Sequence, residues 1–91
     1  ETIELTVGET YEIYNPFYGA GSHPFEFLND AGEVLLSQRN QAVLDSDDDI
    51  NWSNVNGLMT FTLTESLANQ LSGYRCINHV ASMSGAFNII Q

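Results

Sequence analysis

Three side chains with sulfur or nitrogen donor atoms lie close together near the end of this 91-residue chain. Cys76, His79 and Met83 form the pattern Cys-x2-His-x3-Met, which offers a thiolate, an imidazole and a thioether within one short segment. Soft sulfur ligands combined with imidazole select copper over magnesium or calcium. The segment therefore predicts three ligands of a copper site.

A fourth ligand must come from elsewhere, and His23 is the only other histidine in the chain. It shares the alternation of Phe25 and Phe27, so it is expected on the face of a strand that is directed into the core. Two histidines and one cysteine in a plane, with a weak axial methionine, form the blue-copper arrangement. The predicted ligands of one copper ion are His23, Cys76, His79 and Met83.

Short strands are the elements that must position these ligands. Apolar and polar residues alternate over 3–7, 11–13, 25–28 and 58–63, and a period of two marks half-buried strands. Turns at 29–32 and at Asn56-Gly57 predict two hairpins, the second joining 50–52 to 58–63. Thr64 is expected to cap the only helix, over 65–71, which Gly73 closes. With strands at 74–76 and 86–90, the pattern predicts an all-β fold, a Greek-key antiparallel β-sandwich with one short helix.

With these elements in place, the sequence resembles the cupredoxins, the type 1 copper family that includes plastocyanin, azurin and amicyanin. The matching features are a histidine after a glycine-rich loop, in Gly19-Ala20-Gly21-Ser22-His23, and Tyr-x-Cys-x-x-His with a nearby methionine before the last strand, at 74–83. The resemblance covers most of the chain. It implies a single cupredoxin domain over residues 1–91.

The function implied by this resemblance is electron transport. Such a protein is not an enzyme: it carries single electrons between redox proteins by Cu(II)/Cu(I) cycling, and His79 would be the electron port. The family also implies an extracytoplasmic location, periplasmic or at the cell surface, with any anchor outside this chain. We expect a monomer.

Pro24 departs from the asparagine that is common after the first histidine in this family. Proline has no N–H, so the hydrogen bond that family members commonly donate from this position to the cysteine sulfur is expected to be absent. Asn78 would then supply the one N–H contact to the Cys76 sulfur. The segment His23-Pro24-Phe25 also resembles the type 1 site of multicopper oxidases, but the additional histidines of their oxygen-reducing cluster are missing.

Two alternatives to an electron carrier remain open. One is a copper-binding protein for delivery or storage, with a more open site. The other is a β-sandwich interaction domain without redox activity, in which Cys76 is a buried small hydrophobe. Met59 is the competing thioether, but it alternates in step with Phe61 and Leu63 and is predicted to pack in the core. Tyr74 is likewise predicted to be a core aromatic residue.

Twelve acidic residues against two arginines give a net charge of -10. This charge disfavours nucleic acid and anionic membrane surfaces as partners. The chain also has no apolar run long enough to insert into a bilayer. Redox protein partners are expected, and the acidity suits either a basic partner or a salty medium.

The polar stretch from Gln38 to Asp49 is predicted to be a surface excursion. Its acidic cluster at 45–49 is expected to be a solvated loop, with docking to a basic partner as the alternative role. Asp45, Asp47 and Asp49 fit the first positions of an EF-hand, but Ile50 stands where glycine is needed and Asn56 where glutamate is needed. Calcium binding of that kind is therefore not expected. The sequon Asn51-Trp52-Ser53 offers an N-glycosylation site.

Overall fold

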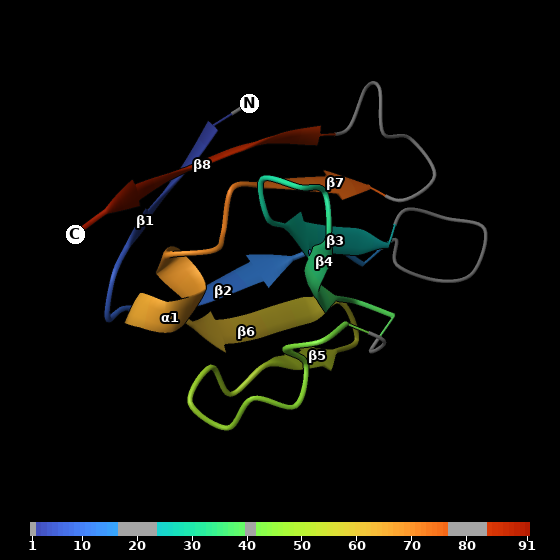
Figure 1. Cartoon of the computed structure of the whole chain (residues 1–91). Helices are drawn as coiled ribbons and strands as arrows, with labels where there is room; N and C mark the ends of the chain where they lie inside the picture. The colour runs from blue at the N-terminus through green and yellow to red at the C-terminus, as the bar shows by residue number, and fades with distance from the viewer. Residues whose placement is uncertain (1, 17–23, 40–41, 77–83) are drawn as a thin grey trace.

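The computed structural model describes residues 2–16, 24–39, 42–76 and 84–91. Within them the chain forms eight strands and one short helix (Figure 1). In chain order these are β1 (Thr2–Thr6), β2 (Thr10–Tyr14), β3 (Phe25–Leu28), β4 (Val34–Ser37), β5 (Ser53–Val55), β6 (Leu58–Thr62), α1 (Glu65–Ala68), β7 (Gly73–Cys76) and β8 (Ser84–Ile90). The prediction of an all-β fold with one short helix is confirmed.

The strands form two sheets, one of five strands in the order β1-β8-β7-β3-β4 and one of three in the order β2-β6-β5. The predicted antiparallel arrangement is wrong for one pair, because β1 lies parallel to β8, in register from Thr2 opposite Ala86 to Thr6 opposite Ile90. Alternating apolar residues identify a strand but carry no information about which strand lies beside it. The two ends of the chain thus pair in a way that the pattern does not reveal.

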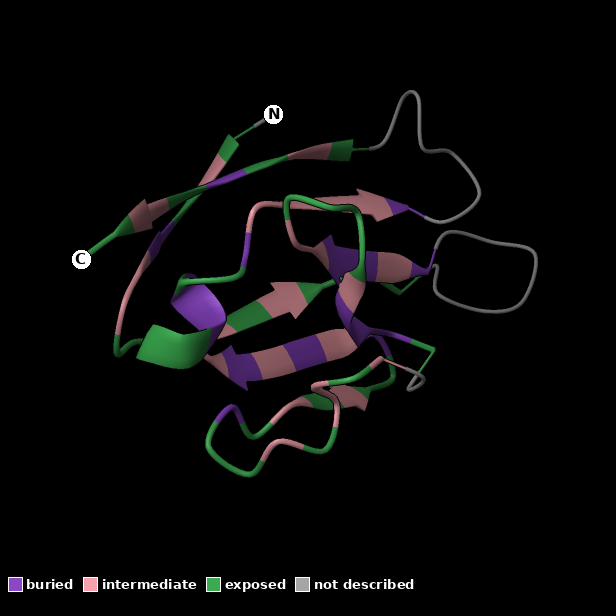
Figure 2. Cartoon of the chain, viewed as in Figure 1, coloured by how far each residue is buried: buried purple, intermediate pink, exposed green. Residues whose placement is uncertain are grey.

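The two sheets enclose one apolar core. Phe27 of β3 and Phe61 of β6 are fully buried, and their rings meet edge to face with centroids 5.1 Å apart. Figure 2 shows buried and half-buried residues alternating along β6. Met59 and Leu63 are also completely buried, so the prediction that Met59 is a core residue is confirmed. The remaining buried apolar members of the core are Leu5, Leu35, Leu36, Ile50, Leu67, Ala68, Leu71 and Phe87.

Both predicted hairpins are present. Asn56 and Gly57 adopt positive φ angles of 52° and 93° between β5 and β6, the conformation that a tight two-residue hairpin turn requires. The strand before this turn begins later than predicted, at Ser53 rather than at residue 50. The reason is Asn51, which has a φ of 54° and therefore lies in a turn. The β3–β4 hairpin closes over Asn29, whose Oδ1 accepts hydrogen bonds from the N–H groups of Ala31 and Glu33.

The helix α1 is shorter than predicted and ends at Ala68, with Asn69 as its C-cap. Its start is as expected, because Thr64 Oγ1 accepts a hydrogen bond from the Leu67 N–H at 3.1 Å. Gly73 does not close the helix but begins β7, where a Cβ atom would lie 2.6 Å from the carbonyl oxygen of Gly85. Glycine is therefore needed at position 73 for the close approach of β7 to β8.

Candidate metal centre

Cys76 is the one predicted copper ligand within the described residues. It is the last residue of β7 and only 2% of its surface is exposed. His23, His79 and Met83 lie outside the described residues, so their predicted roles stay predictions. In the ranges that the structure does describe, no group of three His, Cys, Asp or Glu side chains comes together in a way that could hold a metal ion.

The neighbours of Cys76 are aromatic. In the register of β3 with β7, Cys76 lies opposite Phe25 and Tyr74 lies opposite Phe27. The Tyr74 ring stacks on Phe25 with centroids 5.1 Å apart, and it also contacts Phe87 at 5.2 Å. Since Tyr74 and Cys76 are two residues apart on one strand, both lie on the core side of the sheet. The prediction that Tyr74 is a core aromatic residue is confirmed.

The ends of three adjacent strands meet beside Cys76. β7 lies between β3 and β8 in the sheet, and both pairings are antiparallel. Phe25, the first residue of β3, is opposite Cys76, and Ser84, the first residue of β8, is opposite Arg75. Thus the start of β3, the end of β7 and the start of β8 lie at one end of the five-stranded sheet (Figure 1). Pro24, which precedes β3, has a fully buried side chain at this end.

A buried glutamine ties the two sheets together at this same end. Gln38 follows β4 directly and is only 4% exposed. Its Oε1 accepts hydrogen bonds from the Phe25 N–H at 3.0 Å and from Asn15 Nδ2 at 2.8 Å. Its Nε2 donates to Asn54 Oδ1 at 3.1 Å, to the Asn15 carbonyl oxygen at 3.2 Å and to that of Gly57 at 3.5 Å. One side chain thus joins the start of β3 to the end of β2 and to the β5–β6 hairpin.

Sequence reasoning missed this role of Gln38, because the polar stretch that begins at residue 38 was expected to be a surface excursion. The expectation is wrong for Gln38 itself. The available signal was its position directly after Leu35, Leu36 and Ser37, the last three residues of β4, which are all buried although they face alternate sides of the sheet. Such a strand is covered on both sides, so the next polar side chain needs internal partners.

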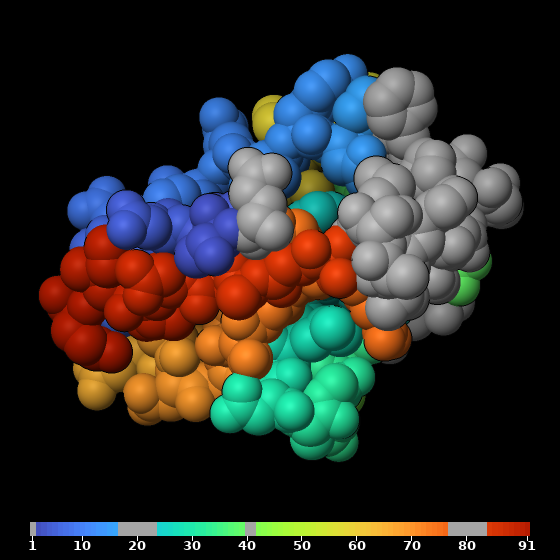
Figure 3. All heavy atoms as spheres, turned by 90° about the horizontal axis from the view of Figure 1, so that it is seen from above, coloured from blue at the N-terminus to red at the C-terminus, as the bar shows by residue number. Residues whose placement is uncertain are grey.

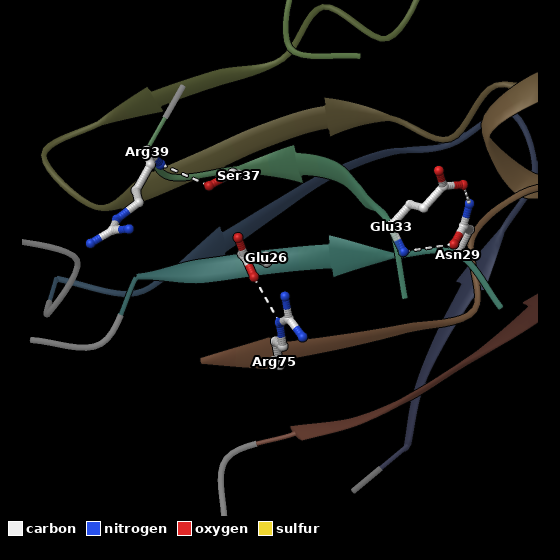
Figure 4. Close-up of polar contacts among 6 residues, drawn as sticks. All are labelled: Glu26, Asn29, Glu33, Ser37, Arg39 and Arg75. Atoms are coloured by element: carbon white, nitrogen blue, oxygen red, sulfur yellow. Dashed lines mark hydrogen bonds and ion pairs between the residues drawn. The ribbon is translucent and has the colours of Figure 1, made fainter. Parts of the chain in front are cut away.

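An ion pair covers the opposite face of the sheet, behind Cys76. Arg75 Nε donates to Glu26 Oε1 at 2.7 Å, and the two residues are directly opposite each other on β7 and β3 (Figure 4). Glu26 is only 8% exposed, a burial that the alternation of β3 did not predict. A shallow hollow beside the pair is lined by Glu26, Val34, Ser37 and Arg39. Both arginines of this acidic chain therefore lie along one face of the sheet.

The acidic loop at 45–49 has an internal structural role in addition to its charge. The two carboxylate oxygens of Asp45 accept hydrogen bonds from the N–H groups of Ser37 at 3.1 Å and Ala42 at 3.0 Å. Burial raises the pKa of Asp45, and these two hydrogen bonds oppose the shift by lowering it. Asp47 Oδ1 accepts from the N–H groups of Asp49 and Ile50. Of the four aspartates in this loop, only Asp48 and Asp49 are exposed. The prediction of a solvated loop therefore holds for these two side chains and not for Asp45 and Asp47.

Comparison with known proteins adds no relative. No protein-family model matches the chain, and no curated protein or solved structure is significantly similar to it. Within the described ranges, no helix is long and apolar enough to cross a membrane. The function must therefore be inferred from the residues and their arrangement.

Proposed function

We propose that this chain is a cupredoxin-like electron carrier that binds one copper ion through His23, Cys76, His79 and Met83. The observation that most supports the proposal is the strand register around Cys76. This register brings the start of β3 and the start of β8 to either side of the buried cysteine. The residue next before Pro24 is His23, and the residue next before Ser84 is Met83.

Adjacent strands lie about 4.8 Å apart, so the chain enters β3 and β8 about one strand spacing from Cys76 on each side. Residues far apart in the sequence, near 24, 76 and 84, are therefore neighbours at one end of the sheet. These features support a site built from all four predicted ligands.

The strands around Cys76 are suited to holding a metal-ligating side chain in a fixed position. Cys76 ends a strand that is paired on both sides, and the Gln38 side chain fixes the backbone N–H of the opposite residue, Phe25. Copper bound in such a site would supply a one-electron Cu(II)/Cu(I) couple. A rigid frame keeps the ligand geometry similar in both oxidation states, which favours fast electron transfer.

The remaining parts of the proposal concern topology, partners and location. The two-sheet all-β fold supports a Greek-key cupredoxin topology. We infer a monomer that exchanges electrons with redox proteins through the edge of His79, in a periplasmic or cell-surface setting. The net charge of -10 favours basic partners over acidic ones.

Copper stoichiometry in matched variants tests the ligand assignment. The full chain and the variants His23→Ala, His79→Ala and Met59→Leu are dialysed against Cu(II), and bound copper is measured. We expect one equivalent for the unaltered chain and for Met59→Leu, because Met59 lies in the core. Either histidine variant should bind much more weakly. Full retention of copper in both histidine variants would contradict the assignment, and rapid loss to a chelator from the unaltered chain would favour the delivery or storage alternative.

A further inference from the structure

The three-stranded sheet ends at β2, and its hydrogen-bond pattern shows which backbone groups face outward. β2 pairs with β6 on one side, and β5 lies on the far side of β6. The Asn15 N–H donates to the Gly57 carbonyl oxygen at 2.8 Å, and the Leu63 N–H donates to the Glu9 carbonyl oxygen at 2.9 Å. Residues 9 and 15 therefore face β6, and in an antiparallel ladder every second residue between them does the same.

The intervening residues of β2 face away from β6. They are Thr10, Glu12 and Tyr14, and within the described part of the chain no strand lies beside them. All three side chains are exposed, and Tyr14 retains 67% of its accessible surface. In Figure 3 the lighter blue of β2 runs along the upper rim of the molecule. The N–H and C=O groups of these residues form an open strand edge.

This edge lacks the usual protection against pairing. Natural edge strands are kept from pairing by short length, bulges, proline or charged side chains, lysine above all. The one charge on the outward-facing residues of β2 is the Glu12 carboxylate, which repels acidic segments but attracts basic ones. Of the other edges, β5 has only three residues, the pairing of β4 with β3 is irregular between Phe27 and Leu28, and on β1 the Thr6 N–H already donates to the Tyr11 hydroxyl at 2.6 Å. β2 has five residues in continuous register with β6 and contains neither proline nor lysine. Behind it, Tyr11 and Ile13 on the core side are only half-buried.

We propose that β2 accepts an extended segment of a partner protein as an additional strand. Main-chain hydrogen bonds to a sheet edge supply affinity, and alternate side chains supply specificity. The segment would carry cationic side chains on the outer face, beside Glu12, and apolar ones on the inner face, over Tyr11 and Ile13. This inference does not depend on copper binding.

Charge selects a basic partner segment over a second copy of this chain. A two-fold antiparallel pairing of β2 with its own copy, centred on the strand, would place Glu12 opposite Glu12. Like charges directly opposite each other on paired strands are destabilising. Two chains that each carry a net charge of -10 also repel each other.

A synthetic six-residue peptide of alternating valine and lysine, labelled with fluorescein, is the probe. Its binding to the full chain is followed by fluorescence anisotropy at low salt. Three variants are compared. Glu12→Pro removes an N–H from the open edge without removing a hydrogen bond to β6. Glu12→Lys reverses the charge at the edge, and Glu4→Lys makes the same charge change on β1, in the other sheet.

We expect the peptide to bind, and to bind at least about tenfold more weakly to Glu12→Pro and Glu12→Lys, with Glu4→Lys within about twofold of the unaltered chain. A peptide that is N-methylated at every residue can donate no main-chain hydrogen bond and should not bind. Equal weakening by Glu4→Lys would show general charge attraction and overturn the proposal. If the unaltered chain self-associates and Glu12→Lys changes that self-association, the edge binds a second copy of this chain, which would also overturn the proposal. Thermal unfolding of each variant checks folding, and Glu12→Lys keeps the test valid if the proline variant unfolds.

Discussion

Replacing Gln38 with leucine tests whether the buried glutamine holds the two sheets together at the end of the molecule where Cys76 lies. The substitution keeps a similar side-chain volume but removes every hydrogen bond of the Gln38 amide. The Phe25 N–H loses its acceptor at 3.0 Å, and Asn54 Oδ1 loses its donor at 3.1 Å. Both groups lie next to a residue that is only 4% exposed, so water replaces the lost partners poorly.

The magnitude follows from these two groups. Each buried polar group left without its partner costs about 1–3 kcal/mol, and burial of the leucine side chain offsets part of this loss. We expect the free energy of unfolding to fall by about 3 kcal/mol. In a domain of this size each kcal/mol shifts the melting temperature by about 4–8 °C, so the midpoint should fall by roughly 12–24 °C.

Urea unfolding of the copper-free chain, followed by Trp52 fluorescence, measures the effect. Gln70→Leu is the matched control, since Gln70 is exposed and its only side-chain hydrogen bond among the described residues goes to the Ser66 carbonyl oxygen. The control should change stability by no more than about 0.5 kcal/mol. A loss below about 1 kcal/mol in Gln38→Leu, with an unchanged m-value, would refute the reasoning.

Three further predictions concern other positions. Gly73→Ala should destabilise the chain by about 1–3 kcal/mol, because the new Cβ would lie 2.6 Å from the Gly85 carbonyl oxygen; an unchanged urea midpoint would contradict the close approach of β7 to β8. Asp45 has a raised pKa, so its contribution to stability is present below the ordinary carboxyl range and is lost as the pH rises through its own pKa. The stability of the unaltered chain relative to Asp45→Asn should therefore decline from acidic to neutral pH, and parallel pH profiles of the two urea midpoints would contradict this. Pro24→Ala restores an N–H beside the predicted sulfur ligand and should raise the reduction potential by roughly some tens of millivolts, since a hydrogen bond to the thiolate favours the reduced state; voltammetry showing no change or a fall would contradict it.

The strands themselves could be predicted, because alternation of apolar residues directly reflects which face of a strand is buried. Met59 and Phe61 illustrate this, since their spacing places both in the core, where they are fully buried. The Asn56-Gly57 turn was equally clear, because few other residues adopt two consecutive positive φ angles. Local conformational preference and burial period were sufficient for these elements.

Contacts between distant residues could not be predicted. The parallel pairing of β1 with β8 joins the two ends of the chain, and nothing local to either strand specifies it. The Arg75–Glu26 ion pair depends on the register of β3 with β7, which alternation alone leaves open. Gln38 was assigned to the surface because its polarity was considered without its partners.

In the candidate site, too, local features could be predicted and long-range ones could not. The sequence suggested that Cys76 would end a strand, and the structure describes it there, buried and opposite Phe25. Its alignment with the start of β3 and the start of β8 is a property of the sheet that no motif contains. The roles of His23, His79 and Met83 stay predictions, since these residues lie outside the described ranges.

The visible spectrum of the copper-loaded chain tests the central claim most directly. Cu(II) is added to one equivalent, and the spectra of the unaltered chain and of Cys76→Ser are recorded side by side. We predict an intense visible band from thiolate-to-copper charge transfer that disappears on reduction, returns on reoxidation and is absent from Cys76→Ser. An unaltered chain that folds and yet shows no such band with Cu(II), or a band that persists in Cys76→Ser, would contradict the assignment of a copper centre at Cys76.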